Sequence, residues 1–179
     1  AAKGFEKDTY FAMAARDIRS LPKLEGTVHV NVALIVKFIA NYFFKPATYP
    51  EVTKQSDEKN DDFLFNQGET HGLDKIRFHD YSIAYNSVHL PNVRVFKKQV
   101  RKLKLFLLLA KPNKAQKRDI DFLLTLGEIF TLVVYGQLIL ENAKIYKIDD
   151  DIVDQIFDCL VRDFSKFALQ LYSKSSATS

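Results

Sequence analysis

The longest apolar stretch of the chain is FLLTLGEIFTLVVYGQLIL, residues 122–140. Its length approaches the ~20 mostly apolar residues that a membrane-spanning helix needs. Small and polar residues interrupt the stretch at Gly127, Glu128, Gly136 and Gln137, and a glutamate in the middle of a membrane span is costly. The sequence therefore predicts a helix over residues 117–144 that is buried in the core of a protein.

The segments on both sides of this stretch repeat apolar residues at helical spacing. Pro91 suits the first turn of a helix, which Pro112 closes, and the acids at 149–151 favour the start of a last helix. The predicted core stripes of these two helices are Val93, Phe96, Val100, Leu103 and Phe106 in the first and Ile152, Ile156, Phe157, Leu160, Phe164, Phe167, Ala168 and Leu171 in the second. Because alternating strand patterns are scarce, we predict an all-α protein, an antiparallel helical bundle.

Further helices are predicted earlier in the chain. Residues 9–20 have apolar residues at helical spacing, and Pro22 is expected to stop this helix because proline does not suit a helix interior. A second helix is predicted over residues 28–44, with Thr27 as its N-cap and Asn31 as the alternative cap. A short helix is expected near residues 81–88.

The composition changes between the early helices and the later ones. Residues 46–79 hold two prolines, two glycines and a polar run at 55–62, and so long a connection often marks a boundary. The sequence therefore predicts three parts: helices in residues 1–45, an irregular linker in 46–79, and a helical C-terminal extension in 80–179.

Composition also narrows the class of protein. A chain of 179 residues with 47% hydrophobic residues can build a core. Cys159 is the only cysteine, so an intramolecular disulfide and a Cys-rich zinc site are excluded, and its apolar setting predicts a small buried side chain. The four histidines show no metal spacing.

The charged opening at 1–19 does not read as a signal peptide, so we expect a cytoplasmic protein, or an organelle-matrix one if an upstream targeting segment is missing.

The motif with most chemical content lies near the N-terminus. Gly4-Phe5 is followed by Arg16-Asp17 and then by Leu24-Glu25-Gly26-Thr27. These anchors and their spacing resemble the acyl-CoA dehydrogenase family. In that family a Gly-Phe follows a glycine pair, an Arg-Asp ends the next helix, and a Glu-Gly-Thr follows after a fixed interval. The resemblance covers about residues 1–45. It implies that the chain is the C-terminal part of a longer flavoprotein and is inactive alone.

The resemblance assigns roles to individual residues. Glu25 matches the base that removes the α-proton of an acyl-CoA thioester, and its backbone N–H matches a donor to the enolate oxygen. Such a base must be buried, and the enolate stabilised, because the α-proton is only weakly acidic. Gly26 matches a position that lets the substrate approach the backbone closely. Hydride then passes to the cofactor FAD.

Further positions match contacts with FAD. Thr27 matches a contact with its adenosine portion, and His29 stands where a polar flavin contact is frequent. Ala1 and Ala2 replace the glycine pair that approaches the FAD pyrophosphate of a neighbouring subunit, so the resemblance also implies a homo-oligomer. Without the family register, Glu25 is an ordinary solvated turn residue, and Arg16 with Asp17 is a helix-end pair to which we assign no catalytic role.

A second functional reading comes from the basic residues of the extension. Between residues 94 and 118 the chain carries no acid and ten cations, several of them expected opposite the apolar stripe of the Pro91 helix. Such a face attracts an acidic membrane surface, nucleic acid or the phosphates of coenzyme A. The alternative is a solvated helix face balanced by the acids at 57–62 and 149–158. The cations are Arg94, Lys97, Lys98, Arg101, Lys102, Lys104, Lys111, Lys114, Lys117 and Arg118.

Overall fold

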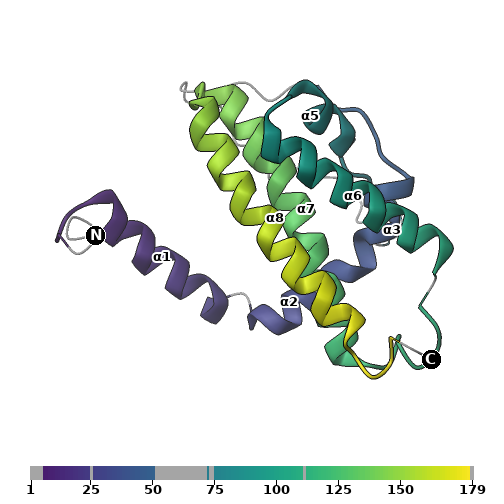
Figure 1. Ribbon diagram of the computed structural model, residues 1–179. Helices are drawn as coiled ribbons and strands as arrows, with labels where there is room; N and C mark the ends of the chain where they lie inside the picture. The colour runs from purple at the N-terminus through teal and green to yellow at the C-terminus, as the bar shows by residue number, and fades with distance from the viewer. Residues whose placement is uncertain (1–5, 25, 51–71, 73–74, 111, 178–179) are drawn as a thin grey trace.

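A computed structural model describes residues 6–24, 26–50, 72, 75–110 and 112–177. Every regular element in these ranges is a helix (Figure 1), which confirms the predicted all-α bundle. The elements are α1 (Tyr10–Leu24), α2 (Val28–Ile35), the 3-10 turn η2 (Val36–Phe38), α3 (Ile39–Phe44), α5 (Tyr81–Ser87), α6 (Pro91–Leu109), α7 (Ile120–Tyr146) and α8 (Asp150–Tyr172).

Helix α7 lies at the centre of the bundle, with α8 along one side and α2 and α5 against others, while α6 packs on α8 (Figure 1). Within the described ranges, α7 is the one helix long and apolar enough to cross a membrane by length and composition, and 50% of its most apolar window is buried. Side chains on several sides of α7 are buried, including Phe122, Ile129, Val133 and Leu140. This burial agrees with the core helix that residues 122–140 predict.

Aromatic side chains form the middle of the core. The ring of Tyr42 meets the ring of Phe130 edge-on at 5.1 Å, and Phe96 meets Phe157 in the same way at 5.4 Å. Tyr85 is 1% exposed and donates a 2.7 Å hydrogen bond to the Val133 carbonyl. Residues on both sides of segment 46–79 thus pack in one core, while the division into three parts stays a prediction.

Several helix starts follow the local sequence. Thr27 caps α2, since its side-chain oxygen accepts a hydrogen bond from the Val30 backbone N–H. Pro91 occupies the first turn of α6. Asp149 caps α8, and α5 begins after the cap Asp80. These caps satisfy backbone donors that have no partner inside their helix, and they confirm the predicted Thr27 cap, the Pro91 start and the short helix near 81–88.

The predictions for the early helices were wrong in two respects. Helix α1 continues through Pro22 to Leu24; a proline in the last turn removes a single backbone hydrogen bond and ends the helix only a few residues later. Segment 28–44 is not one continuous α-helix, because η2 separates α2 from α3. A 3-10 turn has fewer residues per turn, so it rotates the residues that follow, and Tyr42 and Phe43 become buried.

The predicted core stripes also needed correction. In α8 the buried residue of the first turn is Val153, while Ile152 and Ile156 are 53% and 36% exposed. Phe106 of α6 is 38% exposed. Cys159 is exposed rather than buried. It lies beside the buried stripe of α8 that contains Phe157, Leu160 and Phe164 and not within it, so the apolar periodicity of this helix does not bury it. Helix α7 begins at Ile120 instead of residue 117, after the cap Asp119.

Candidate functional site

The predicted catalytic motif lies at the junction between α1 and α2. Gly26 has a φ of +93°, a left-handed conformation that favours glycine. A Cβ atom built on Gly26 would meet nothing within 4 Å, so the backbone conformation, not crowding, requires the glycine. The space in front of this backbone is open to a ligand. Glu25, Ala1 and Ala2 lie outside the described residues.

Thr27 and His29 are exposed beside this junction. The Thr27 hydroxyl oxygen accepts from Val30 N at 3.4 Å, and the Thr27 carbonyl accepts from Asn31 N at 3.1 Å. The N–H groups of Val28 and His29, at the first turn of α2, have no hydrogen-bond partner among the described residues. Together they direct the partial positive charge of a helix N-terminus toward the junction.

His29 also lines a polar hollow of about 520 Å³ formed with α7 and α8. The other walls include the carboxylates Asp121 and Glu128 and the amine Lys174. The fold thus brings a predicted site residue into one hollow with acids from later in the chain, which spacing in the sequence does not indicate. In the part of the chain that the structure describes, no group of three or more His, Cys, Asp or Glu is arranged to hold a metal ion.

Helix α1 projects away from the bundle (Figure 1), and its apolar side chains are uncovered. Phe11 is 63% exposed, Ile18 66% and Leu21 57%. These residues recur at helical spacing, so they form one apolar stripe along α1. Arg16 and Asp17 are exposed on the same helix.

The structure exposes most of the predicted cationic face of α6. Arg94, Lys98, Arg101 and Lys102 are exposed, whereas Lys97 is half-buried. Lys104, also half-buried, places its Nζ 5.7 Å from the ring centroids of both Phe44 and Tyr81. Lys111 lies outside the described residues.

Exposed leucines that were not among the predicted site residues lie at the C-terminal end of the same helix. Leu105, Leu108 and Leu109 are 54%, 58% and 75% exposed. At 100° per residue, Leu105 and Leu109 fall on the same side of α6 as Lys98 and Lys102. The surface therefore combines apolar side chains with positive charge.

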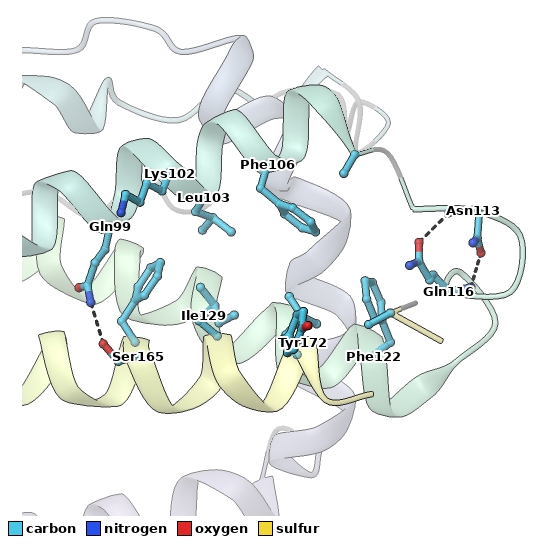
Figure 2. A pocket seen from close by; sticks show the side chains of 15 residues that line it. Gln99, Lys102, Leu103, Phe106, Asn113, Gln116, Phe122, Ile129, Ser165 and Tyr172 are labelled. Atoms are coloured by element: carbon cyan, nitrogen blue, oxygen red, sulfur yellow. Dashed lines mark hydrogen bonds between the residues drawn. The ribbon is translucent and has the colours of Figure 1, made fainter. Parts of the chain in front are cut away.

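A second, apolar cavity of about 660 Å³ lies between α6, α7, α8 and the segment after α8 (Figure 2). Its walls include Leu103, Phe106, Phe122, Ile129 and Phe164. The sequence alone does not indicate this cavity, because its lining comes from segments that are far apart in the chain. Phe106, which belongs to the predicted core stripe of α6, is partly exposed because it lines this cavity.

Other polar groups serve the fold. The Nδ1 atom of His79 accepts a hydrogen bond from Tyr49 N at 3.1 Å, and Asp80 accepts from Ser82 N at 2.8 Å as the cap of α5. Burial raises the pKa of Tyr42 and of Tyr85 above the ordinary value, and neighbouring tyrosines raise it further. Both phenols are therefore neutral hydrogen-bond donors in the core.

Comparisons of the chain with protein-family models, with curated proteins and with solved structures find no match.

Proposed function

We propose that the chain is the C-terminal part of an acyl-CoA dehydrogenase-like flavoprotein in which Glu25 removes the α-proton of an acyl-CoA thioester. The observation that carries the proposal is the junction between α1 and α2, where the left-handed Gly26 and the cap Thr27 separate two helices at the position of the motif. Gly26 and Thr27 of the motif therefore lie directly before the N-terminus of α2. The bundle beyond it is the extension of that protein.

The residues around the junction suit the chemistry. The N–H groups of Val28 and His29 favour negative charge that develops on a thioester oxygen when the α-proton leaves. The open space at Gly26 allows a thioester to approach the backbone. Glu25 takes the proton, and the chemistry that bound FAD would supply is the acceptance of a hydride from the β-carbon.

The junction is also compatible with FAD as a neighbour. Because the Thr27 oxygen accepts from Val30 N, its hydroxyl hydrogen is available to donate to an acceptor on the cofactor. His29 is exposed beside it with a second donor.

The uncovered stripe of α1 supports a larger protein. Apolar side chains such as Phe11 and Ile18, more than half exposed, gain free energy when covered, at about 25 cal/mol per Å² of buried apolar area. In the proposed protein the rest of the dehydrogenase chain, within a homo-oligomer, covers them.

The test uses the protein that carries these residues together with an upstream flavin domain. Anaerobic addition of acyl-CoA is expected to bleach the flavin absorbance. In Glu25→Gln the bleaching rate is expected to fall by about 10²–10⁴-fold, the contribution of a general base, with the flavin still bound. Asp17→Asn, which alters an exposed carboxylate on α1, is the matched control and should keep the rate. A normal rate in Glu25→Gln would rule out the proposal.

A second candidate function, a non-catalytic module that binds an acidic membrane surface, is favoured by the end of α6. Exposed Leu105, Leu108 and Leu109 adjoin the cations of the same helix. Apolar side chains beside Lys and Arg are typical of helices that lie in a membrane interface. This combination favours a membrane over nucleic acid, whose phosphates attract the cations but offer no apolar layer to the leucines.

Co-sedimentation distinguishes these partners. The chain is expected to bind phosphatidylserine vesicles at low salt and to be released at high salt. Leu108→Ser with Leu109→Ser should weaken vesicle binding, while Leu138→Ser, at an exposed leucine of α7, should not. Equal binding to DNA and to vesicles, unchanged by the leucine substitutions, would exclude the membrane module.

A further inference from the structure

The apolar cavity between α6, α7 and α8 has the dimensions of a ligand site. Its volume of about 660 Å³ falls inside the roughly 300–1,000 Å³ that small-molecule sites span. Leu103, Phe106, Phe122, Ile129 and Phe164 give it apolar walls. It shares no lining residue with the polar hollow beside His29, so it is separate from the site of the proposed function.

The cavity is elongated. Its α6 wall runs from Gln99 to Ala110, a distance of about 16 Å along a helix. Figure 2 shows the lining side chains in a row, from Gln99, Lys102 and Ser165 at one end, past Leu103, Ile129 and Phe106, to Gln116 and Asn113 at the other. An extended apolar chain matches this shape better than a compact ring system does.

The two ends differ in chemistry. At the far end Asn113 and Gln116 are occupied with each other, since the backbone N–H of each donates at 2.9 Å to the side chain of the other. At the near end Gln99 Nε2 donates to the Val161 carbonyl at 3.1 Å and to Ser165 Oγ at 3.0 Å. These bonds fix the polar side chains of the wall.

The charge of the cavity lining indicates the charge of the ligand that it would bind. Lys102 is the one charged side chain among the described residues that line the cavity, and the lining includes no aspartate or glutamate. Lys98 and Arg101, both exposed, precede it on α6. A positive mouth over an apolar interior complements an amphiphile with an anionic head.

We propose that this cavity binds a single-chain amphiphile with an anionic head, of the long-chain carboxylate class. The head lies at Lys102 and the hydrocarbon chain extends along Leu103, Phe106 and Ile129 toward Phe122. The site is independent of the proposed acyl-CoA chemistry, because none of its lining residues belongs to the α1–α2 junction.

The purified 179-residue chain serves for the test, with dansyl-undecanoic acid as the fluorescent probe. We expect saturable binding of one probe per chain, displaced by palmitate and much less by hexadecylamine or hexadecanol. Ala168→Phe places a ring in the cavity and is expected to weaken binding by about tenfold or more. Absence of saturable binding to the folded chain, or unchanged binding in a folded Ala168→Phe, overturns the proposal.

Two substitutions of the exposed Lys102 test the head group without disturbing the core. Lys102→Gln is expected to weaken palmitate binding by about two- to five-fold, whereas the control Lys45→Gln, at an exposed lysine that follows α3 and does not line the cavity, leaves it unchanged. Lys102→Glu is expected to reverse the preference, so that hexadecylamine competes better than palmitate. If Lys102→Glu keeps the preference for palmitate, or wild-type protein binds the amine as tightly as the acid, the proposal is wrong.

Discussion

The Tyr42 hydroxyl donates a 2.6 Å hydrogen bond to Gln137 Oε1, and both side chains are buried. The bond joins α3, which precedes the segment 46–79, to the central helix α7. Gln137 Nε2 continues the network with a 2.8 Å bond to Glu141. A buried amide in the middle of an apolar helix is thereby satisfied, as buried polar groups generally must be.

Tyr42→Phe leaves the buried Gln137 oxygen without its donor. We expect a loss of about 1–3 kcal/mol in the free energy of unfolding, which lowers Tm by about 2–4 °C per kcal/mol in a chain of this size. Denaturant unfolding and thermal melts measure the loss. Tyr135→Phe, at an exposed tyrosine of α7, is the control. An equal stability of the two variants would contradict the role of the bond.

Gly127→Ala tests the packing of α2 on α7. A Cβ atom at this position would lie 2.6 Å from Val32 Cγ1 and 2.7 Å from the Val32 backbone oxygen. Because a backbone atom has to move, we expect destabilisation of about 1–3 kcal/mol, despite the better helix propensity of alanine. Asn142→Ala, exposed on the same helix, should be neutral or stabilising. A stabilised Gly127→Ala protein would show that α2 lies farther from α7.

Asp119 makes stability depend on pH. Hydrogen bonds from Ser176 Oγ at 2.5 Å and from Phe122 N at 3.1 Å favour its carboxylate, so the pKa of Asp119 lies below its usual value in the folded state. The unfolded chain therefore binds a proton first as the pH falls. The ionised Asp119 therefore adds to the free energy of unfolding. This contribution is complete above the pKa of the unfolded chain, about pH 4, and is lost as the pH falls through the pKa of the folded protein.

The measurement is the difference in unfolding free energy between wild type and Asp119→Asn across the acid range. We expect the difference to shrink as the pH decreases below about 4. Ser176→Ala should make the unfolding free energy less dependent on pH in this range, because the Ser176 hydroxyl is the largest cause of the lowered pKa of Asp119. A difference that does not vary with pH would show that these bonds do not form.

The exposed side chain of Cys159 predicts rapid chemical modification. We expect Ellman's reagent to titrate one thiol per folded chain, at a rate within about tenfold of that in denaturant, because reaction requires no opening of the core. A thiol that reacts only after unfolding would show that Cys159 is buried, as the sequence predicted, and would contradict its exposed position in the fold.

Local features of the fold were predictable from the sequence. Thr27, Pro91 and Asp149 act on the backbone within a few residues of their own position, so the helix starts that they set follow from the chain alone. The all-α class followed from apolar residues that recur at helical spacing along the chain.

Features that depend on packing between helices were not predictable. Ile152 and Val153 are adjacent apolar residues, and only the positions of α6 and α7 decide that Val153 is the buried one. The same reason explains the exposed Cys159 and the cavity beside Phe106. Of the candidate site, the spacing of Glu25, Gly26 and Thr27 indicated the motif, but not that His29 lines one hollow with Asp121 and Glu128.

Exchange of the α-proton tests the role of Glu25 most directly, because it reports proton removal alone. The protein with its flavin domain is mixed with acyl-CoA in D2O, and deuterium at the α-carbon is followed by mass spectrometry. We predict exchange in wild type and in Asp17→Asn, and a rate lower by about 10²–10⁴-fold in Glu25→Gln. Exchange in Glu25→Gln at the wild-type rate would contradict the account.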